Sequence, residues 1–183
     1  MTKQEFKELT EKKIVILDGA TGSNLQKCGL ESGVCPEAWI LEHPQTLMDL
    51  QRAFVEAGSD IVYAPTFTAN RIKLAEYGLE EKRRQMNLDL VELSKKAVGD
   101  KAFVAGDLTM TGEQLAPIGK LPLEELITVY KEQILDMVEA GVDLEYIYQV
   151  ATEELGLVST DDSQIIYYDQ IESGYVRQNE IIP

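Results

Sequence analysis

Three short runs of apolar, mostly β-branched residues constrain the fold of this chain most strongly. They are residues 14–17 (IVIL), 61–64 (IVYA) and 102–105 (AFVA), and turn-forming Gly, Pro or Asp follows each of them. Continuous apolar runs of this length are typical of strands in a parallel sheet, where helices cover both faces. The sequence therefore predicts three buried parallel strands, and residues 142–150 are a candidate for a fourth.

Apolar residues at helical spacing lie between these runs. They predict helices near residues 4–11, 44–57, 71–77 and 82–98, and a last helix that begins at Pro122. The predicted apolar stripe of the last helix is Leu123, Leu126, Ile127, Tyr130, Ile134, Met137 and Val138. Glycines at 58, 99 and 141 are suitable C-terminal stops. Alternating strands and helices indicate right-handed βαβ units, either in an open doubly wound sheet or in half of a (βα)₈ barrel.

Polar and turn residues follow each predicted strand. Asp18-Gly19, Pro65-Thr66 and Gly106-Asp107 all fall at carboxyl ends of strands. Both architectures place their reactive loops at this edge of the sheet, so we expect a site there. The alternative is that Gly and Asp at these positions only form βα turns.

The net charge of −15 argues against polyanions as binding partners. Nucleic acids and anionic membranes are not expected to bind, because too few Lys and Arg residues are present to neutralise phosphates. No apolar run reaches the length of a membrane span, and residues 1–13 lack the apolar segment of a secretory signal. These features predict a cytoplasmic protein.

Potential metal ligands are scarce. The chain has two cysteines, Cys28 and Cys35, and one histidine, His43. A structural zinc site takes four such ligands, so a carboxylate or a second chain would have to contribute. A Cys28–Cys35 disulfide needs an oxidising compartment, and we therefore favour two free thiols and no metal.

The composition changes after residue 144. Residues 145–183 contain eight acidic residues, a single base and five of the eight tyrosines, and they contain no lysine. We therefore predict a body at residues 1–144 and an acidic, Tyr-rich tail at residues 145–183, with chance variation in a short segment as the alternative. The tail has a strand candidate at residues 164–169 and no assigned chemistry.

Four segments together resemble the homocysteine S-methyltransferase family, which includes the N-terminal module of cobalamin-dependent methionine synthase. They are residues 16–22 (ILDGATG), residues 44–61, residues 66–74 (TFTANRIKL), and Gly106-Asp107 with Thr111-Gly112. The resemblance covers about residues 10–144. It implies parallel βα units equivalent to the first half of a (βα)₈ TIM barrel, followed by a divergent tail.

The resemblance also implies a reaction and a set of binding residues. Family members transfer a methyl group from a methylated donor, such as a methylcorrinoid, to the thiolate of homocysteine, which a zinc ion on three cysteines activates. Those cysteines come from later strands, and none follows Cys35 here, so no zinc or other cofactor is expected in this chain. The residues implied near the amino-acid group of homocysteine are Asp18, Gly19, Ala20 and Thr66. No catalytic residue is assigned.

Two departures from the family pattern qualify this function. Pro65 stands where family members usually have Asn. Tyr148 and Gln149 fall where the family has Glu-Thr, so the Glu that binds the substrate amine is missing unless Glu145 takes its place. Three hypotheses remain. The first is a partial homocysteine pocket in a truncated or chimeric form that is inactive alone. The second is a purely structural half-barrel chimera or fragment without ligand, and the third is an enzyme completed by a separate chain that carries the missing half. Exposed sheet edges predict a homo-oligomer in each case.

Overall fold

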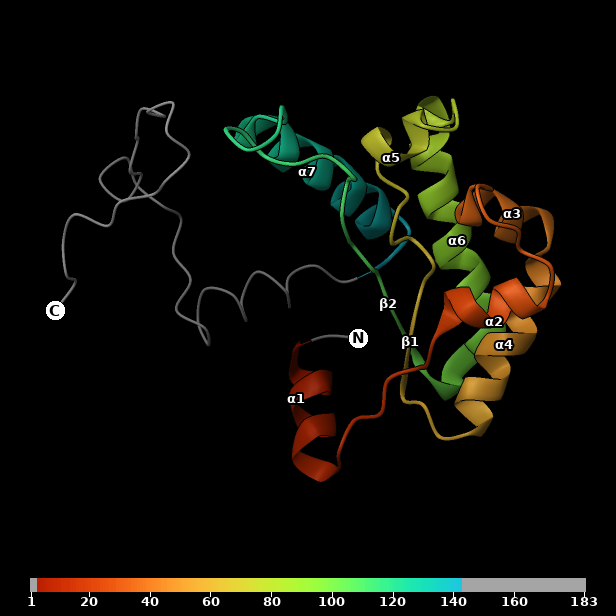
Figure 1. Cartoon of the computed structure of the whole chain (residues 1–183). Helices are drawn as coiled ribbons and strands as arrows, with labels where there is room; N and C mark the ends of the chain where they lie inside the picture. Colours follow the sequence, from red (N-terminus) through yellow and green to blue (C-terminus); the bar gives the residue numbers. More distant parts are fainter. Residues whose placement is uncertain (1–2, 143–183) are drawn as a thin grey trace, which may run out of the picture. The chain divides into compact units, whose positions relative to one another are not determined.

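The computed structural model describes residues 3–142, which Figure 1 shows in colour. Contacts divide the chain into two units, Met1–Tyr146 and Ile147–Pro183, and the description below concerns the first. The predicted strand at residues 142–150 lies almost wholly outside the described residues, and the predicted tail at residues 145–183 lies entirely outside them. The predicted boundary after residue 144 therefore stays a prediction.

Two parallel strands form the sheet of the described part. In it, β1 (Ile61–Tyr63) pairs with β2 (Phe103–Ala105), with Ile61 opposite Phe103. Both strands were predicted, and their connection through a helix confirms a parallel βαβ unit.

The prediction of a buried strand at residues 14–17 is wrong in two respects. This segment makes one isolated parallel bridge, from Leu17 to Ile61, and Ile14 is 88% exposed. The backbone does follow β1, because the N–H groups of Asp60 and Ile61 both donate to the carbonyl of Ile16. An apolar run predicts a strand only when neighbours cover it, and the described residues leave this segment largely uncovered.

Helices make up most of the described part, and those predicted at residues 4–11, 44–57, 71–77, 82–98 and after Pro122 are confirmed. The α-helices are α1 (Lys3–Lys12), α2 (Thr21–Lys27), α3 (Pro36–Glu42), α4 (Pro44–Glu56), α5 (Arg71–Ala75), α6 (Arg83–Val98) and α7 (Leu123–Glu139). Short 3₁₀ turns occur at η1 (Glu80–Lys82) and η2 (Gly99–Lys101). None of these helices is both long and apolar enough to cross a membrane.

The core lies between one face of the sheet and helices α4 and α6. Val62 of β1 is fully buried and packs with Ala97 and Val98 at the end of α6. Helix α6 also contacts α3 and α7, so it is the central helix of this unit (Figure 1). On the other face of the sheet, Tyr63 and Phe103 are each 37% exposed.

The buried face of α7 differs from the predicted apolar stripe. Leu123 and Ile127 are more than half exposed, whereas Val129, Gln133 and Asp136 are buried. The reason is that α7 meets its neighbours partly through polar contacts: Gln133 bonds to the loop after β1, and Asp136 pairs with an arginine of α6.

Candidate functional site

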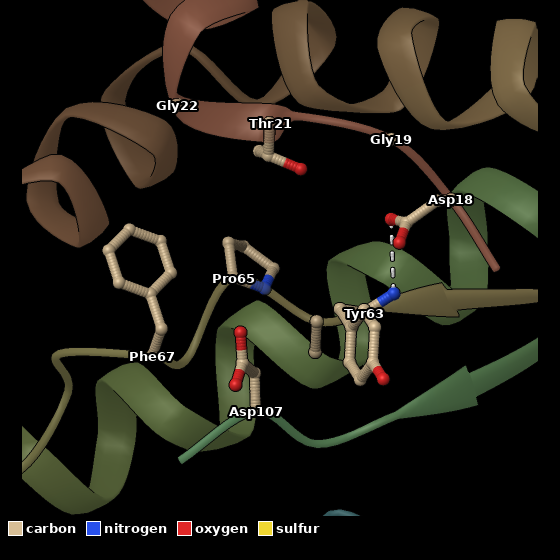
Figure 2. Close-up of a pocket in the computed structure, with 9 residues that line it drawn as sticks. Asp18, Gly19, Thr21, Gly22, Tyr63, Pro65, Phe67 and Asp107 are labelled. Atoms are coloured by element: carbon tan, nitrogen blue, oxygen red, sulfur yellow. Dashed lines mark hydrogen bonds between the residues drawn. The ribbon is translucent and has the colours of Figure 1, made fainter. Parts of the chain in front are cut away.

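A cavity of about 200 Å³ lies at the carboxyl ends of the strands (Figure 2). Three segments form its wall: the turn after Leu17, the turn after β1 and the turn after β2. The lining residues are Asp18, Gly19, Thr21, Gly22, Tyr63, Ala64, Pro65, Phe67 and Asp107. This position is where parallel α/β folds place their ligands.

The first carboxyl group of the cavity belongs to Asp18. Its Oδ2 accepts a hydrogen bond of 3.1 Å from the backbone N–H of Tyr63, so β1 fixes its position (Figure 2). Burial raises the pKa of the Asp18 carboxyl above its ordinary value, and the nearby charge of Asp107 raises this pKa further, although backbone hydrogen bonds oppose the change. An ionised Asp18 is therefore more stable when a cation lies beside it.

The second carboxyl group belongs to Asp107, in the turn after β2. Thr66 holds the backbone of this residue from both sides: its Oγ1 accepts from the N–H of Asp107 at 3.1 Å and donates to the carbonyl of Asp107 at 2.9 Å. Burial raises the pKa of the Asp107 carboxyl as well.

Together the two carboxyl groups make the cavity acidic. Asp18 and Asp107 come from different turns, and no Lys, Arg or His is among the residues that line the cavity. Such a site attracts a cation, and an ammonium group can donate charge-assisted hydrogen bonds to both carboxylates.

A glycine allows close packing at the edge of the cavity. A Cβ atom on Gly19 would lie 2.8 Å from Cε1 of Phe54 on α4, which is shorter than any normal contact. The backbone of this turn therefore approaches α4 more closely than any other residue would permit. This contact sets the position of the turn that carries Asp18.

The structure brings two of the four predicted binding residues into the cavity wall. Asp18 and Gly19 line it, whereas Ala20 lies between lining residues as the N-cap of α2. Thr66 is fully buried, and its hydroxyl is engaged by Asp107. A direct contact between substrate and any of these residues stays a prediction.

Other lining residues were not among the predicted binding residues. Asp107 had a usable signal, because it follows the third apolar run and so falls at the same edge of the sheet as Asp18. Tyr63 and Phe67 lie in the second apolar run and in the motif at residues 66–74, but their side-chain types gave no reason to assign them to a polar binding site.

The segment at residues 66–74 is a structural junction. The N–H of Thr68 donates to the fully buried carboxylate of Glu37 on α3, at 3.0 Å. Asn70 caps the N-terminus of α5 with its side chain, and Arg71 forms ion pairs with α7 residues, including Glu132 at 3.1 Å. The polar groups of residues 66–74 thus connect this segment to α3 and α7.

The predicted free thiols are confirmed. Cys28 is exposed, whereas Cys35 is buried at the N-cap of α3, and its Sγ donates to Glu37 at 3.5 Å. Burial raises the pKa of the Cys35 thiol to about 11. Among residues 3–142, no three His, Cys, Asp or Glu side chains form a group that could hold a metal ion.

The fold and the site define a parallel α/β protein with an acidic cavity at the carboxyl edge of its sheet. A family model for homocysteine S-methyltransferase matches residues 15–155. The chain belongs to this family, as its sequence resemblance indicates. The match continues past residue 144, where the composition changes.

Individual relatives agree with this assignment. Methionine synthase of Mycobacterium leprae (strain TN) is 26% identical over 150 residues, which cover 74% of this chain and 12% of that protein. The homocysteine methyltransferase MmuM from Escherichia coli has the same fold. Its oxidised form superimposes with a TM-score of 0.60 at 18% identity, covering 81% of this chain and 62% of that one. The metallated form gives 0.64 at 19% identity, covering 82% and 63%. This chain thus spans less than two thirds of each relative.

Proposed function

We propose that this chain binds the amino-acid end of homocysteine in the acidic cavity. The observation that carries the proposal is the pair of carboxyl groups, Asp18 and Asp107, which face one cavity; the lining residues among positions 3–142 include no base. The α-ammonium group of the substrate supplies the missing positive charge. Gly19 and Ala20 are the predicted contacts for the rest of the amino-acid group, through their backbone, and Thr66 acts by holding Asp107.

The pH dependence of binding follows from the raised pKa values of both carboxyl groups. A protonated carboxyl group has no charge to attract an ammonium, so affinity should increase as pH rises through these pKa values and then level off. The ammonium group of homocysteine stays protonated over this range.

Methyl transfer itself requires more than the described residues provide. The family activates the homocysteine thiol on a zinc ion, and the donors of this chain do not fit that ion: Cys35 is buried and bonded to Glu37, and no three-ligand group exists among residues 3–142. We propose that the purified chain holds no stoichiometric zinc and transfers no methyl group from methylcobalamin. Metal analysis after dialysis tests this, and about one bound zinc per chain would contradict it.

A second candidate function is an enzyme completed by another chain. Tyr63 and Phe103, on the face of the sheet that the described residues leave partly open, favour it, because partly exposed apolar groups are stabilised by a partner. The proposed partner is a separate chain that carries the missing half, because a second copy would bring only the same two cysteines. The predicted homo-oligomer is a separate proposal. Light scattering that gives the 20.5 kDa mass of one chain would contradict self-association.

Isothermal titration calorimetry tests the binding proposal. Homocysteine is compared with 4-mercaptobutanoate, which lacks the amine, and with 3-mercaptopropylamine, which lacks the carboxylate. We expect homocysteine and 3-mercaptopropylamine to bind and 4-mercaptobutanoate not to bind. In Asp18→Asn and Asp107→Asn, affinity for homocysteine should fall about tenfold, because each change removes one charge-assisted contact.

A control variant and a negative outcome complete this experiment. Asp89 accepts a hydrogen bond from Gln85 on the surface of α6, far in the chain from the lining residues, so Asp89→Asn should bind like the unaltered chain. Equal weakening by all three substitutions would indicate a general charge effect. Absence of heat with every ligand would refute the proposal and favour a purely structural role.

A further inference from the structure

Two buried glutamines flank the turn that follows β1. Gln51 of α4 and Gln133 of α7 are both fully buried. The Nε2 of Gln51 donates to the carbonyl of Tyr63 at 3.0 Å, and the Nε2 of Gln133 donates to the carbonyl of Thr66 at 2.6 Å. The two helices thus hold the two ends of residues 63–66, a segment whose middle forms part of the cavity wall (Figure 2).

Each glutamine leaves one polar atom without a partner. The Oε1 atoms of Gln51 and Gln133 are buried and make no hydrogen bond in the described structure. An unsatisfied buried acceptor is destabilising, and an apolar side chain of similar size would avoid this cost. The contribution of each side chain therefore comes from its Nε2 group, which donates to a backbone carbonyl of the turn.

Side chains of α6 contact both amides and orient that of Gln133. Gln51 Nε2 also donates to Ser94 Oγ at 3.1 Å, and Gln133 Nε2 also donates to Asn87 Oδ1 at 3.4 Å. The Nδ2 of Asn87 is already engaged by two backbone carbonyls, so its oxygen is the atom that faces Gln133. This arrangement directs the donor group of Gln133, and not its oxygen, towards the contact.

The segment held by the glutamines in turn holds both carboxyl groups of the cavity. Tyr63 donates its N–H to Asp18, and Thr66 bonds to the backbone of Asp107 from both sides. We infer that Gln51 and Gln133 are positioning residues that fix Asp18 and Asp107, respectively, in the wall of the cavity that receives the cationic group. The ligand part of this inference rests on the proposed function, whereas the positioning part does not.

Carboxyl ¹³C NMR titration of the full chain tests the positioning directly. Methionine is similar to glutamine in size and helix propensity but donates no hydrogen bond, so the variants are Gln51→Met and Gln133→Met. Gln133→Met should lower the pKa of Asp107 towards its ordinary value, because a looser turn admits water, and should leave the pKa of Asp18 nearly unchanged. Gln51→Met should lower the pKa of Asp18 and leave the pKa of Asp107 nearly unchanged.

Gln85→Met is the matched control. Gln85 is an exposed helical glutamine that donates to Asp89, so its replacement should move neither carboxyl pKa. The inference would be overturned if the two buried variants moved both carboxyl groups equally or moved neither. If Gln133→Met does not fold, Gln133→Leu carries the same test, because it also removes the Nε2 donor to the Thr66 carbonyl.

Homocysteine affinity provides the second readout. Each buried variant should bind about threefold to tenfold more weakly, and Gln133→Met should have no further effect in an Asp107→Asn background. An additive loss in the double variant would contradict action through Asp107. If the unaltered chain binds no homocysteine, the proposed function fails, and the two carboxyl pKa values still decide whether the glutamines position these groups.

Discussion

Replacing Thr66 with valine isolates the contact on which the position of Asp107 depends. Valine has nearly the same shape as threonine but cannot form the two hydrogen bonds to the Asp107 backbone, of 2.9 and 3.1 Å. Thr66 is fully buried, so water cannot replace the hydroxyl at this position.

The expected loss of stability follows from these two bonds. Each hydrogen bond contributes about 1 kcal/mol, which gives a decrease of about 2 kcal/mol in the free energy of unfolding for Thr66→Val. With a urea dependence of about 2 kcal/mol per molar, the unfolding midpoint should fall by about 1 M. Circular dichroism at increasing urea concentration measures this midpoint.

Thr128→Val is the matched control for this measurement. Thr128 is exposed on α7, and its hydroxyl donates to the carbonyl of Glu124 at 2.8 Å, where water is an adequate substitute. Its replacement should change the unfolding free energy by less than about 0.5 kcal/mol. Equal midpoints for the two variants would refute the reasoning, because the buried bonds of Thr66 would then contribute nothing.

Three further predictions concern the turn at the first carboxyl group and the two thiols. Gly19→Ala should lower stability by about 1–3 kcal/mol, because its Cβ would lie 2.8 Å from Phe54 and the ring must move; an unchanged urea midpoint would contradict this. Cys28 should react rapidly with a thiol reagent at neutral pH while Cys35 stays unreacted until the chain unfolds, since Cys35 is buried with a pKa of about 11. Asp18 has a pKa raised from 3.8, mainly by burial, so the folded state binds its proton more strongly than the unfolded state does. As pH rises from about 4 through that raised pKa, the unaltered chain should lose stability relative to Asp18→Asn and then keep a constant difference, and a pH-independent difference would contradict it.

The helices show how far sequence patterns predict this fold. Helices α4 and α6 have repeated apolar spacing and end next to Gly58 and Gly99, both of which have positive φ. Helices α2 and α3 were missed, because seven residues are too few for a recognisable apolar repeat. Pro36 at the start of α3 was an available signal for a helix N-terminus.

The strands and the site show which features sequence patterns do not predict. The run at residues 14–17 has the composition of a buried strand, but burial depends on what covers it, and Ile14 is 88% exposed. Asp18 and Gly19 were predicted at the site from a local motif. Gln51 and Gln133 lie inside helices with no local motif, so their contacts with the turn after β1 appear only once the helices pack.

The central claim is that this chain binds homocysteine in the acidic cavity. A ¹H–¹⁵N correlation spectrum of the full chain, recorded during titration with homocysteine, tests it most directly. The account predicts saturable shifts centred on the amides of Gly19, Thr21, Gly22 and Asp107, which surround the cavity. In Asp18→Asn the same shifts should need about tenfold more homocysteine to reach half of their full size. Absence of saturable shifts, or shifts confined to residues away from the cavity, would contradict the account.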